Sequence, residues 1–389
     1  MFSLFDCPNP ILFGHGNSAL IGEKLTELGC KKVLVVYDMG IKAAGIADKV
    51  LGFIRAADIE VVLFDKVEAD PPDYLVNEAG ALGVSENVDG IVGIGGGSSL
   101  DTAKGARLLL SNPAPINQYF AFRNVPGEMD GIIDKNLLKP LIVIPTTAGT
   151  GSEATPGGII TDTKKNEKFP IHCLVSLAII DPELTTGLPS GVTAATGFDA
   201  LCHSVEALTS IKPNRLSEVL AKESIMLIAK YLPIACRDGS NIEAREAMAL
   251  AATLGGIALR GPGGGIPHDI GKFIGIKYHV PHGTAGGCLL AETMKFIAPC
   301  VPDKVRIVAE SMGAEVCADA SPEMIGEILC ETIRKLYWDV NMPPMNSFVN
   351  DKAELVDNAA SLFKGKSQTP RPLTSEAVAE ILANSYDNN

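Results

Sequence analysis

The chain carries little positive charge and no long uninterrupted apolar run. Its 33 Lys and Arg residues face 46 Asp and Glu residues, which gives a net charge of −13 at pH 7. Such an acidic surface repels nucleic acid and anionic membranes, so we expect neither as a partner. The longest uncharged helical stretch, 247–259, ends at Arg260 and is shorter than the ~18 residues that span a bilayer. The first residues also lack the charged and apolar regions of a secretion signal.

Paired cysteines are missing as well. The nine cysteines are scattered, and no Cys-x-x-Cys motif occurs among them. An odd number without such pairing favours reduced thiols, so we expect a cytoplasmic protein. With 389 residues, of which 46% are hydrophobic, the chain is long enough to form two globular domains.

Strand-like and helix-like segments alternate over the first half of the chain. The sequence predicts buried strands at 32–37, 59–64, 90–94 and 140–145, and helices at 21–28, 46–57 and 74–84. This alternation is typical of a parallel sheet with helices on its faces. From about residue 190, the pattern predicts helices at 194–209, 215–231, 242–259, 281–297, 302–312 and 321–336. We therefore expect an α/β domain over residues 1–188 and an all-helical domain over residues 189–389.

Histidine is scarce and unevenly placed. Only six occur, and three of them join one aspartate in the set Asp199, His203, His268 and His282. Asp199 and His203 are four residues apart, so they share one face of a helix. Three imidazoles and a carboxylate suit Fe(II) or Zn(II) and do not suit Ca²⁺ or Mg²⁺. A metal of this kind polarises a substrate oxygen, so the set predicts an enzyme with a catalytic metal site.

Three consecutive glycines, at 95–97, follow a buried strand and begin a helix. Glycines allow a close approach of the backbone to an anion, and the helix N-terminus supplies N–H groups and a positive dipole end. An ordinary structural turn is the alternative. The position after a buried strand favours a pyrophosphate site, with the candidate contacts Gly96, Gly97, Ser98 and Asp101.

Residues 145–153 form a second loop of small and hydroxyl-bearing residues, directly after the next strand. Ligands of open α/β sheets bind at the carboxyl ends of the strands, so two such loops favour a shared nucleotide site. Asp38 ends an earlier strand, where its carboxylate would bind a ribose diol and repel a 2′-phosphate. We therefore expect NAD(H) as the cofactor in preference to NADP(H).

These motifs together resemble those of the iron-dependent (group III) alcohol dehydrogenases, which share a fold with dehydroquinate synthase. The resemblance rests on residues 95–98 with Asp101 and Lys104, and on residues 145–153, 181–184, 197–203 and 281–283. It implies an NAD(H)-dependent enzyme that interconverts a short aldehyde and a primary alcohol. It also implies an α/β dinucleotide-binding domain with a parallel sheet, an all-α C-terminal domain that binds metal and substrate, and a homodimer or larger homo-oligomer.

The resemblance also assigns site residues. The family's metal ligands fall on Asp199, His203, His268 and His282. Its cofactor contacts fall on Asp38, Gly96, Gly97, Ser98, Thr146, Thr147, Thr150, Lys168 and Leu188. Asp70 occupies a position beside the adenosine where many members carry Asn.

The chain departs from the family pattern near the third metal ligand. Lys272 replaces a second, non-ligating His, and a Gly- and Pro-rich segment after Arg260 replaces a stretch that is normally helical. Pro262 and the glycines should break that helix and open space beside the metal. His279, where Asn is common, is the candidate proton relay. The catalytic candidates are therefore Arg260, Lys272 and His279.

Two cations beside a metal suggest a substrate with an anionic tail, because guanidinium and ammonium groups bind carboxylates and sulfonates. The favoured substrate is sulfoacetaldehyde, reduced to isethionate as in a sulfoacetaldehyde reductase. Succinic semialdehyde, reduced to 4-hydroxybutyrate, and neutral short-chain alcohols are alternatives, since both cations could instead reach solvent or pair with Asp269. A dehydroquinate-synthase-like lyase and a nucleotide-sensing or metal-storage protein are more distant alternatives.

Overall fold

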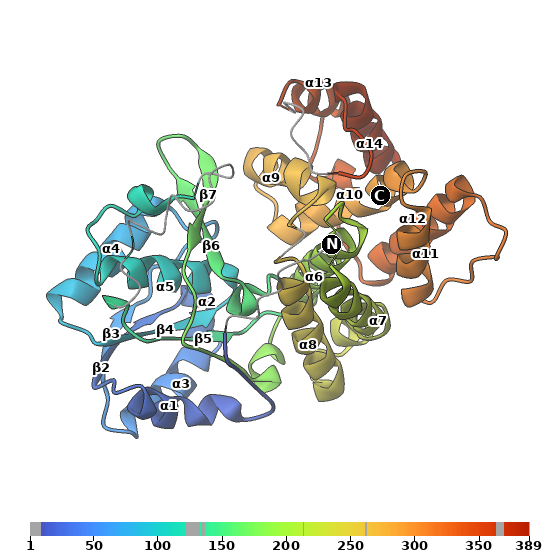
Figure 1. Cartoon of the computed structure of the whole chain (residues 1–389). Helices are drawn as coiled ribbons and strands as arrows, with labels where there is room; N and C mark the ends of the chain where they lie inside the picture. Colours follow the sequence, from blue (N-terminus) through green and yellow to red (C-terminus); the bar gives the residue numbers. More distant parts are fainter. Residues whose placement is uncertain are drawn as a thin grey trace. The chain divides into compact units, whose positions relative to one another are not determined.

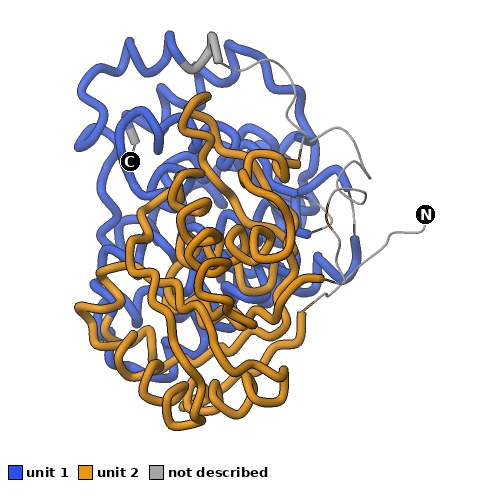
Figure 2. The backbone as a smooth tube through the Cα atoms, turned by 90° about the vertical axis from the view of Figure 1, so that its left-hand side faces the viewer, with its two compact units in different colours: residues 1–6, 148–151, 188–389 blue, residues 7–147, 152–187 orange. Residues whose placement is uncertain are grey.

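The computed structural model describes residues 9–121, 133, 137–212, 214–260, 263–362 and 369–388. It contains two compact units that alternate along the chain (Figure 2). The α/β unit comprises Cys7–Thr147 and Ser152–Gly187, and the helical unit comprises Ala148–Gly151 and Leu188–Asn389. The predicted domain boundary at 188/189 stays a prediction. In addition to Leu188–Asn389, the short segment Ala148–Gly151 groups with the helical unit.

A six-stranded sheet forms the centre of the α/β unit, in the order β1-β8-β5-β4-β2-β3 (Figure 1). Its strands are β1 Ile11–Phe13, β2 Lys32–Val36, β3 Glu60–Phe64, β4 Gly90–Gly95, β5 Leu141–Pro145 and β8 Leu177–Ile180. All neighbouring pairs are parallel, which confirms the predicted parallel sheet. A hairpin of β6 (Gly157–Asp162) and β7 (Glu167–His172) was not predicted.

Alternate residues of the central strands enter two different hydrophobic cores. Val92 and Ile142 pack on one side of the sheet, whereas Ile91 and Leu141 pack on the other. Every residue of β4 and β5 is buried. Such strands have continuous apolar sequences because helices cover both faces of a parallel sheet. The helices of this unit are α1 Ile21–Glu27, α2 Met39–Ala43, α3 Ile46–Arg55, α4 Asp73–Ser85 and α5 Gly97–Leu109.

The described residues of the helical unit contain helices and no strand. The helices are α6 Ser190–Thr209, α7 Arg215–Arg237, α8 Ile242–Ala258, α9 Ile266–Tyr278, α10 His282–Ile297, α11 Pro302–Ser311, α12 Pro322–Asp339, α13 Lys352–Leu362 and α14 Ser375–Asn388. Several begin at residues that cap the free N–H groups of the first turn, such as Asn214, Asn241 and Ser321. None of the helices described in this structure is both long enough and apolar enough to cross a membrane.

Helix α6 lies at the centre of the helical unit. From Thr193 to Thr209 every residue except Thr196 is buried. The segment 148–151 packs directly against this core: a Cβ on Gly149 would lie 2.7 Å from the Cβ of Thr196, and a Cβ on Gly151 would lie 2.7 Å from the carbonyl oxygen of Ala252. Because α6 is buried on nearly all sides, its few polar residues must find partners inside the protein.

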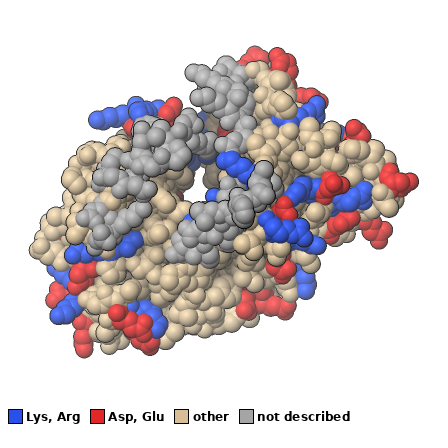
Figure 3. Space-filling model, viewed as in Figure 1, with Lys and Arg blue, Asp and Glu red and all other residues tan. Residues whose placement is uncertain are grey.

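Charged side chains of both signs are interspersed on the face shown in Figure 3. Several form surface ion pairs, including Lys66 with Glu78 at 2.5 Å and Lys277 with Glu354 at 2.7 Å. Solvent and salt screen such exposed pairs, so they contribute little to stability. The buried cores are therefore the main source of stability in both units.

Candidate active site

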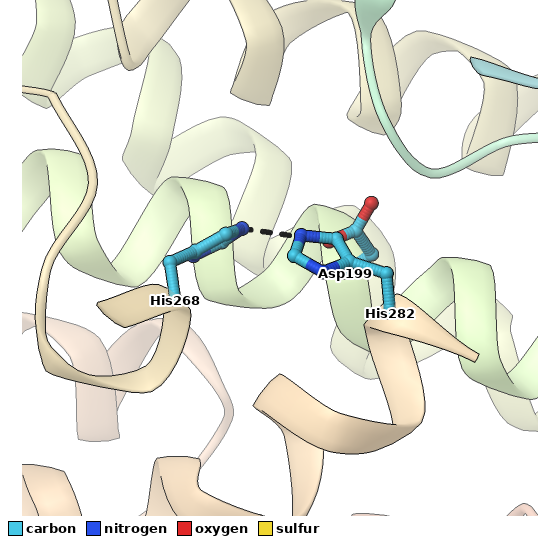
Figure 4. Close-up of side chains that lie close together, drawn as sticks. All are labelled: Asp199, His268 and His282. Carbon is cyan, nitrogen blue, oxygen red and sulfur yellow. Dashed lines mark ion pairs between the residues drawn. The ribbon is translucent and has the colours of Figure 1, made fainter. Parts of the chain in front are cut away.

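Three helices of the helical unit bring one aspartate and three histidines together. Asp199 and His203 belong to α6, His268 lies in the first turn of α9, and His282 begins α10. The Oδ1 atom of Asp199 lies 3.9, 3.6 and 3.8 Å from the Nε2 atoms of the three rings, in that order. Ligand atoms of Asp199, His268 and His282 lie within 4.8 Å of one another (Figure 4). His203 lies outside that tighter group, and its ring stacks on that of His268 at 4.7 Å.

The charges of this cluster favour a cation. Burial by itself raises the pKa of Asp199, but the three facing imidazoles hold that pKa well below its usual range. Burial lowers the pKa of His203, which favours a neutral ring with a free lone pair. An ionised carboxylate at Asp199 and a neutral imidazole at His203 are the protonation states that divalent metals require of such ligands.

Glu206 is a further buried carboxylate that the sequence analysis missed. It lies on α6 and is 4% exposed, and its Oε2 atom is 2.5 Å from Nδ1 of His268. Burial by itself lowers the pKa of His268, but the carboxylates of Glu206 and Asp199 raise it to about 10. A signal was present, because residue 206 follows Asp199 by seven positions and so shares its helix face.

The residues present fit a metal ion. Both ring nitrogens of His268 are buried without a hydrogen-bond partner within the described part of the chain; Nδ1 has the ion-pair contact with Glu206, whereas Nε2 faces Asp199. A buried nitrogen without a partner is costly, and a bound cation would remove that cost. The neighbouring Oδ1 of Asp199 supplies negative charge at 3.6 Å. Nitrogen and oxygen donors of this kind suit Fe(II) and Zn(II) alike.

The approach of α10 to α6 depends on Gly283. A Cβ at this position would lie 1.9 Å from the carbonyl oxygen of Ala195 and 3.0 Å from the Cβ of Asp199. Backbone atoms cannot move aside as the end of a flexible side chain can. The absence of a side chain at Gly283 therefore lets α10 place His282 beside Asp199.

The three catalytic candidates lie around α9. Arg260 follows α8 and is partly buried, and Lys272 lies one helical turn after His268 and is also partly buried. His279 is exposed and ends α9 in the left-handed conformation, with φ 53°. The 11 residues from His268 to His279 correspond to about 16 Å along a helix, so these two residues belong to opposite ends of α9. Along the sequence, Arg260 and Lys272 are both closer to His268 than His279 is.

The helix break predicted after Arg260 is present. Helix α8 ends at Ala258 and α9 begins at Ile266, while Gly261 and Pro262 lie outside the described residues. The glycines that follow lie close to two side chains of the cluster. A Cβ on Gly265 would lie 3.3 Å from Cγ of Glu206, and a Cβ on Gly264 would lie 3.5 Å from Cβ of His268. Gly265 thus makes room for Glu206, whereas the space at Gly264 is that of an ordinary contact.

The predicted phosphate-binding turn lies in the α/β unit, between β4 and α5. Gly95 has φ 143°, a value that L-residues rarely adopt, and a Cβ on Gly96 would lie 3.3 Å from Thr147. The carboxylate of Asp38 is fixed nearby, because its Oδ1 accepts hydrogen bonds from the first turn of α2 and its Oδ2 accepts one from Ser99. Helix α5 begins at Gly97, so its N-terminal N–H groups lie at this turn.

Three of the predicted cofactor contacts form a connected group. The backbone N–H of Asp70 donates to Oγ of Ser98 at 3.3 Å, and Nζ of Lys168 lies 2.6 Å from Oδ1 of Asp70. Thr146 also joins the turn, since its backbone N–H donates to the carbonyl oxygen of Gly95. Two further candidates, Thr150 and Leu188, belong to the helical unit.

The protein itself engages the carboxylate of Asp101. Its Oδ1 accepts from Ser152 at 2.7 Å, and its Oδ2 accepts from the N–H of Ile159 at 2.8 Å. Nζ of the buried Lys104 lies 3.9 Å away and donates to the carbonyl oxygen of Ser152 at 2.6 Å. Asp101 and Lys104 therefore hold α5 against the loop at Ser152 and against β6, and a direct contact of Asp101 with a cofactor stays a prediction.

Replacing Gly283 by Ala should damage both the fold and the metal site. The added methyl group cannot fit 1.9 Å from the carbonyl oxygen of Ala195, so the start of α10 and His282 must shift. We expect a lower Tm and weaker metal binding, measured by thermal unfolding and by metal analysis. Gly191→Ala is a control for the loss of a glycine, because this exposed position on α6 has no positive φ and nothing lies within 4 Å of its Cβ position. A Gly283→Ala protein with normal Tm and metal content would contradict this account of the packing.

Known proteins with similar sequences share this architecture. The chain matches the iron-containing alcohol dehydrogenase family over residues 8–182 and the C-terminal part of the Fe-containing alcohol dehydrogenase family over residues 193–386. It is 32% identical to the NAD-dependent methanol dehydrogenase of Bacillus methanolicus, over 98% of this chain and 99% of that protein. It is 34% identical to the sulfoacetaldehyde reductase of Bilophila wadsworthia, over 77% of this chain and 76% of that protein.

A solved structure extends the likeness to the fold. The crystal structure of a 1,3-propanediol oxidoreductase superposes with a TM-score of 0.88 at 34% identity, covering 98% of this chain and all of that one. The three relatives are named for different alcohols or aldehydes, so the likeness extends to the type of reaction and not to one substrate. This chain is an oxidoreductase that belongs to the iron-containing alcohol dehydrogenase family.

Proposed function

We propose that this enzyme interconverts a short aldehyde and a primary alcohol with the help of a divalent metal and NAD(H). The observation that carries the proposal is the carboxylate oxygen of Asp199, which three imidazole Nε2 atoms face at 3.6–3.9 Å inside the helical unit. Asp199, His203, His268 and His282 would hold Fe(II) or Zn(II). Such an ion supplies Lewis-acid polarisation of the substrate oxygen.

The protein's own residues would orient the substrate and handle its proton. Asp199, His203 and His268 are buried, and a low-dielectric environment strengthens the electrostatic interactions that develop during the reaction. His279 is exposed and precedes His282 by three residues, so it is suited to exchange a proton with solvent. The hydride itself is transferred by the nicotinamide, and the chain contributes its position and surroundings.

The cofactor proposal rests on the turn between β4 and α5. The pyrophosphate would bind at Gly96, Gly97 and Ser98, and the ribose hydroxyls would bind at Asp38. The carboxylate of Asp38 is already fixed by donors from α2 and by Ser99, and such preorganisation lowers the entropic cost of binding. Asp70, Thr146, Thr147, Thr150, Lys168 and Leu188 are proposed as the further contacts.

Removing a proposed metal ligand should abolish metal binding and turnover together. In Asp199→Ala or His268→Ala, one ligand is lost and the remaining groups no longer balance the charge of the ion. We expect metal content and kcat to fall in parallel, measured by elemental analysis and by NADH oxidation after anaerobic loading. His172→Ala, an exposed histidine on β7, serves as the control. Full turnover in a metal-free Asp199→Ala protein would refute the assignment.

The protein should bind NADH more tightly than NADPH, because the carboxylate of Asp38 repels a 2′-phosphate. Asp38→Asn should narrow this difference, and Asn keeps the N-cap of α2, so the variant isolates the effect of charge. Fluorescence titration gives the Kd of each cofactor. Asp65→Asn removes a surface carboxylate that pairs with Lys42 and should leave the ratio unchanged. Tighter binding of NADPH by the wild-type protein would end the proposal.

We propose an aldehyde with an anionic tail as the substrate, with sulfoacetaldehyde favoured. Arg260 and Lys272 flank the segment that carries His268, and both cations suit a sulfonate or a carboxylate. Likeness to a sulfoacetaldehyde reductase supports this choice, while likeness to methanol and propanediol enzymes keeps neutral short-chain alcohols as the alternative. Succinic semialdehyde would use the same two cations.

Lys272→Met should raise the KM for sulfoacetaldehyde and leave the KM for propanal unchanged. Loss of one charge-assisted hydrogen bond costs roughly 1.5–3 kcal/mol, or about 10- to 150-fold in KM. The assay follows NADH oxidation at low salt, since salt weakens charge recognition. Lys277→Met is a matched control in the same helix, where Lys277 pairs with Glu354. A wild-type preference for propanal would overturn the proposed substrate class.

Several broader expectations remain proposals. A homodimer or larger homo-oligomer is usual for the family that the sequence resembles. We also propose a cytoplasmic location, because the eight cysteines among the described residues are all free thiols, as a reducing compartment favours. Sustained NADH consumption would separate the proposed reductase from a lyase that uses NAD only transiently.

A further inference from the structure

We infer that Glu206 is a positioning residue of the metal site: its carboxylate fixes the ring of His268 so that Nε2 is the nitrogen turned toward Asp199. The inference rests on the proposed function, since it assumes that His268 binds the metal. It goes beyond the four proposed ligands, because Glu206 acts through His268 and itself faces the other nitrogen of that ring.

The carboxylate holds His268 at two points. Its Oε1 atom accepts the backbone N–H of His268 at 3.1 Å, and its Oε2 atom lies 2.5 Å from Nδ1 of the ring. A carboxylate accepts protons and cannot donate one, so the proton of the neutral ring belongs on Nδ1. The lone pair of the ring is then on Nε2, which lies 3.6 Å from Oδ1 of Asp199. A carboxylate in this position is the partner that metal-binding histidines commonly have.

The position of Glu206 on α6 explains how one helix organises the whole cluster. Asp199, His203 and Glu206 are spaced by four and three residues, so they lie along one face. Asp199 and His203 would hold the ion, and Glu206 accepts a backbone N–H from the first turn of α9. Helix α9 has Gly265 as its N-cap residue, which has no capping side chain, and Glu206 accepts an N–H of its first turn instead. The negative charge also suits the positive end of the α9 dipole.

The glycines before α9 fit this arrangement. A Cβ on Gly265 would lie 3.3 Å from Cγ of Glu206, which is tighter than an ordinary contact, and 3.5 Å from its Oε1 atom. A side chain at that position would therefore press on the carboxylate that holds His268. The glycine that ends the segment after Arg260 therefore leaves room for Glu206.

Glu206 also balances charge. Asp199 and Glu206 are 4% exposed each, so two negative charges are buried at this site. A divalent cation beside two carboxylates and neutral imidazoles leaves no net charge, and a buried site strongly favours such a balance. With Gln in place of Glu206, one positive charge would remain uncompensated. In addition, Gln has only one acceptor oxygen for the two donors of His268.

The test compares Glu206→Gln, Glu206→Ala and Glu206→Asp with the wild-type protein. Metal-free full-length protein is titrated with Co(II) against a competing chelator, which gives the Kd, and the visible Co(II) spectrum reports the ligand geometry. We expect Glu206→Gln and Glu206→Ala to bind Co(II) about 10- to 100-fold more weakly, with a changed spectrum. Glu206→Asp keeps the charge with a shorter side chain and should fall between these variants and the wild type.

Glu292→Gln is the matched control. Glu292 is also 4% exposed, lies on α10 of the same unit, and pairs with Arg334, so its loss removes a buried carboxylate away from the ligands. We expect a lower Tm for this variant and an unchanged Kd for Co(II). This comparison separates general destabilisation from an effect on His268.

Two kinds of result distinguish the inference from the proposed function. Folded Glu206→Gln or Glu206→Ala protein that binds Co(II) as tightly as the wild type, with the same spectrum, would overturn the positioning role. If Glu206→Ala does not fold, Glu206→Gln decides the question by the same measurement. Failure of the proposed function looks different: the wild type would bind no Co(II), or Asp199→Ala would bind it equally well.

Discussion

The buried carboxylate of Asp199 is the constraint on which the helical unit depends. An ionised group inside an apolar core is unfavourable unless other groups compensate it, and here three imidazoles from three helices face one of its oxygen atoms. Helices α9 and α10 must therefore meet α6 at this point. The close packing at Gly283 brings α10 to α6, and the hydrogen bond from His268 to Glu206 joins the start of α9 to α6. Core packing and metal chemistry are thus parts of one arrangement in this protein.

Two carboxylates on one helix have different surroundings and different roles. Asp199 is surrounded by imidazole rings, whereas Glu206 binds both the backbone and the ring of His268. The pKa of His268 is raised to about 10 between them, despite the opposite effect of burial. Without a metal ion, a proton on His268 would compensate the negative charges of Asp199 and Glu206. A bound metal ion would supply that positive charge instead. The site therefore attracts positive charge whichever cation supplies it.

Much of the fold could be predicted because its signals are local. Apolar runs predicted β2, β4 and β5, and the spacing of Asp199 and His203 placed both residues on one helix face. Other features depend on contacts between distant residues. Glu206 binds a residue 62 positions away, and Asp101 is held by Ile159 at a separation of 58. Strand β6 begins with two glycines and β7 contains Pro170, and both residue types are depleted in strands, so the sequence of this hairpin has little strand character.

Residues 148–151 interrupt the sequence of the α/β unit but pack as part of the helical unit, which limits how this protein can be divided. Gly149 and Gly151 press their backbones against α6 and α8, although the residues on either side of them belong to the sheet-containing unit. A gene fragment that starts at Leu188 would encode every proposed metal ligand but would leave the surface under this segment open to water. No single division of the chain therefore yields a complete unit. Neither unit could be replaced by one from another protein through a single crossover in the gene.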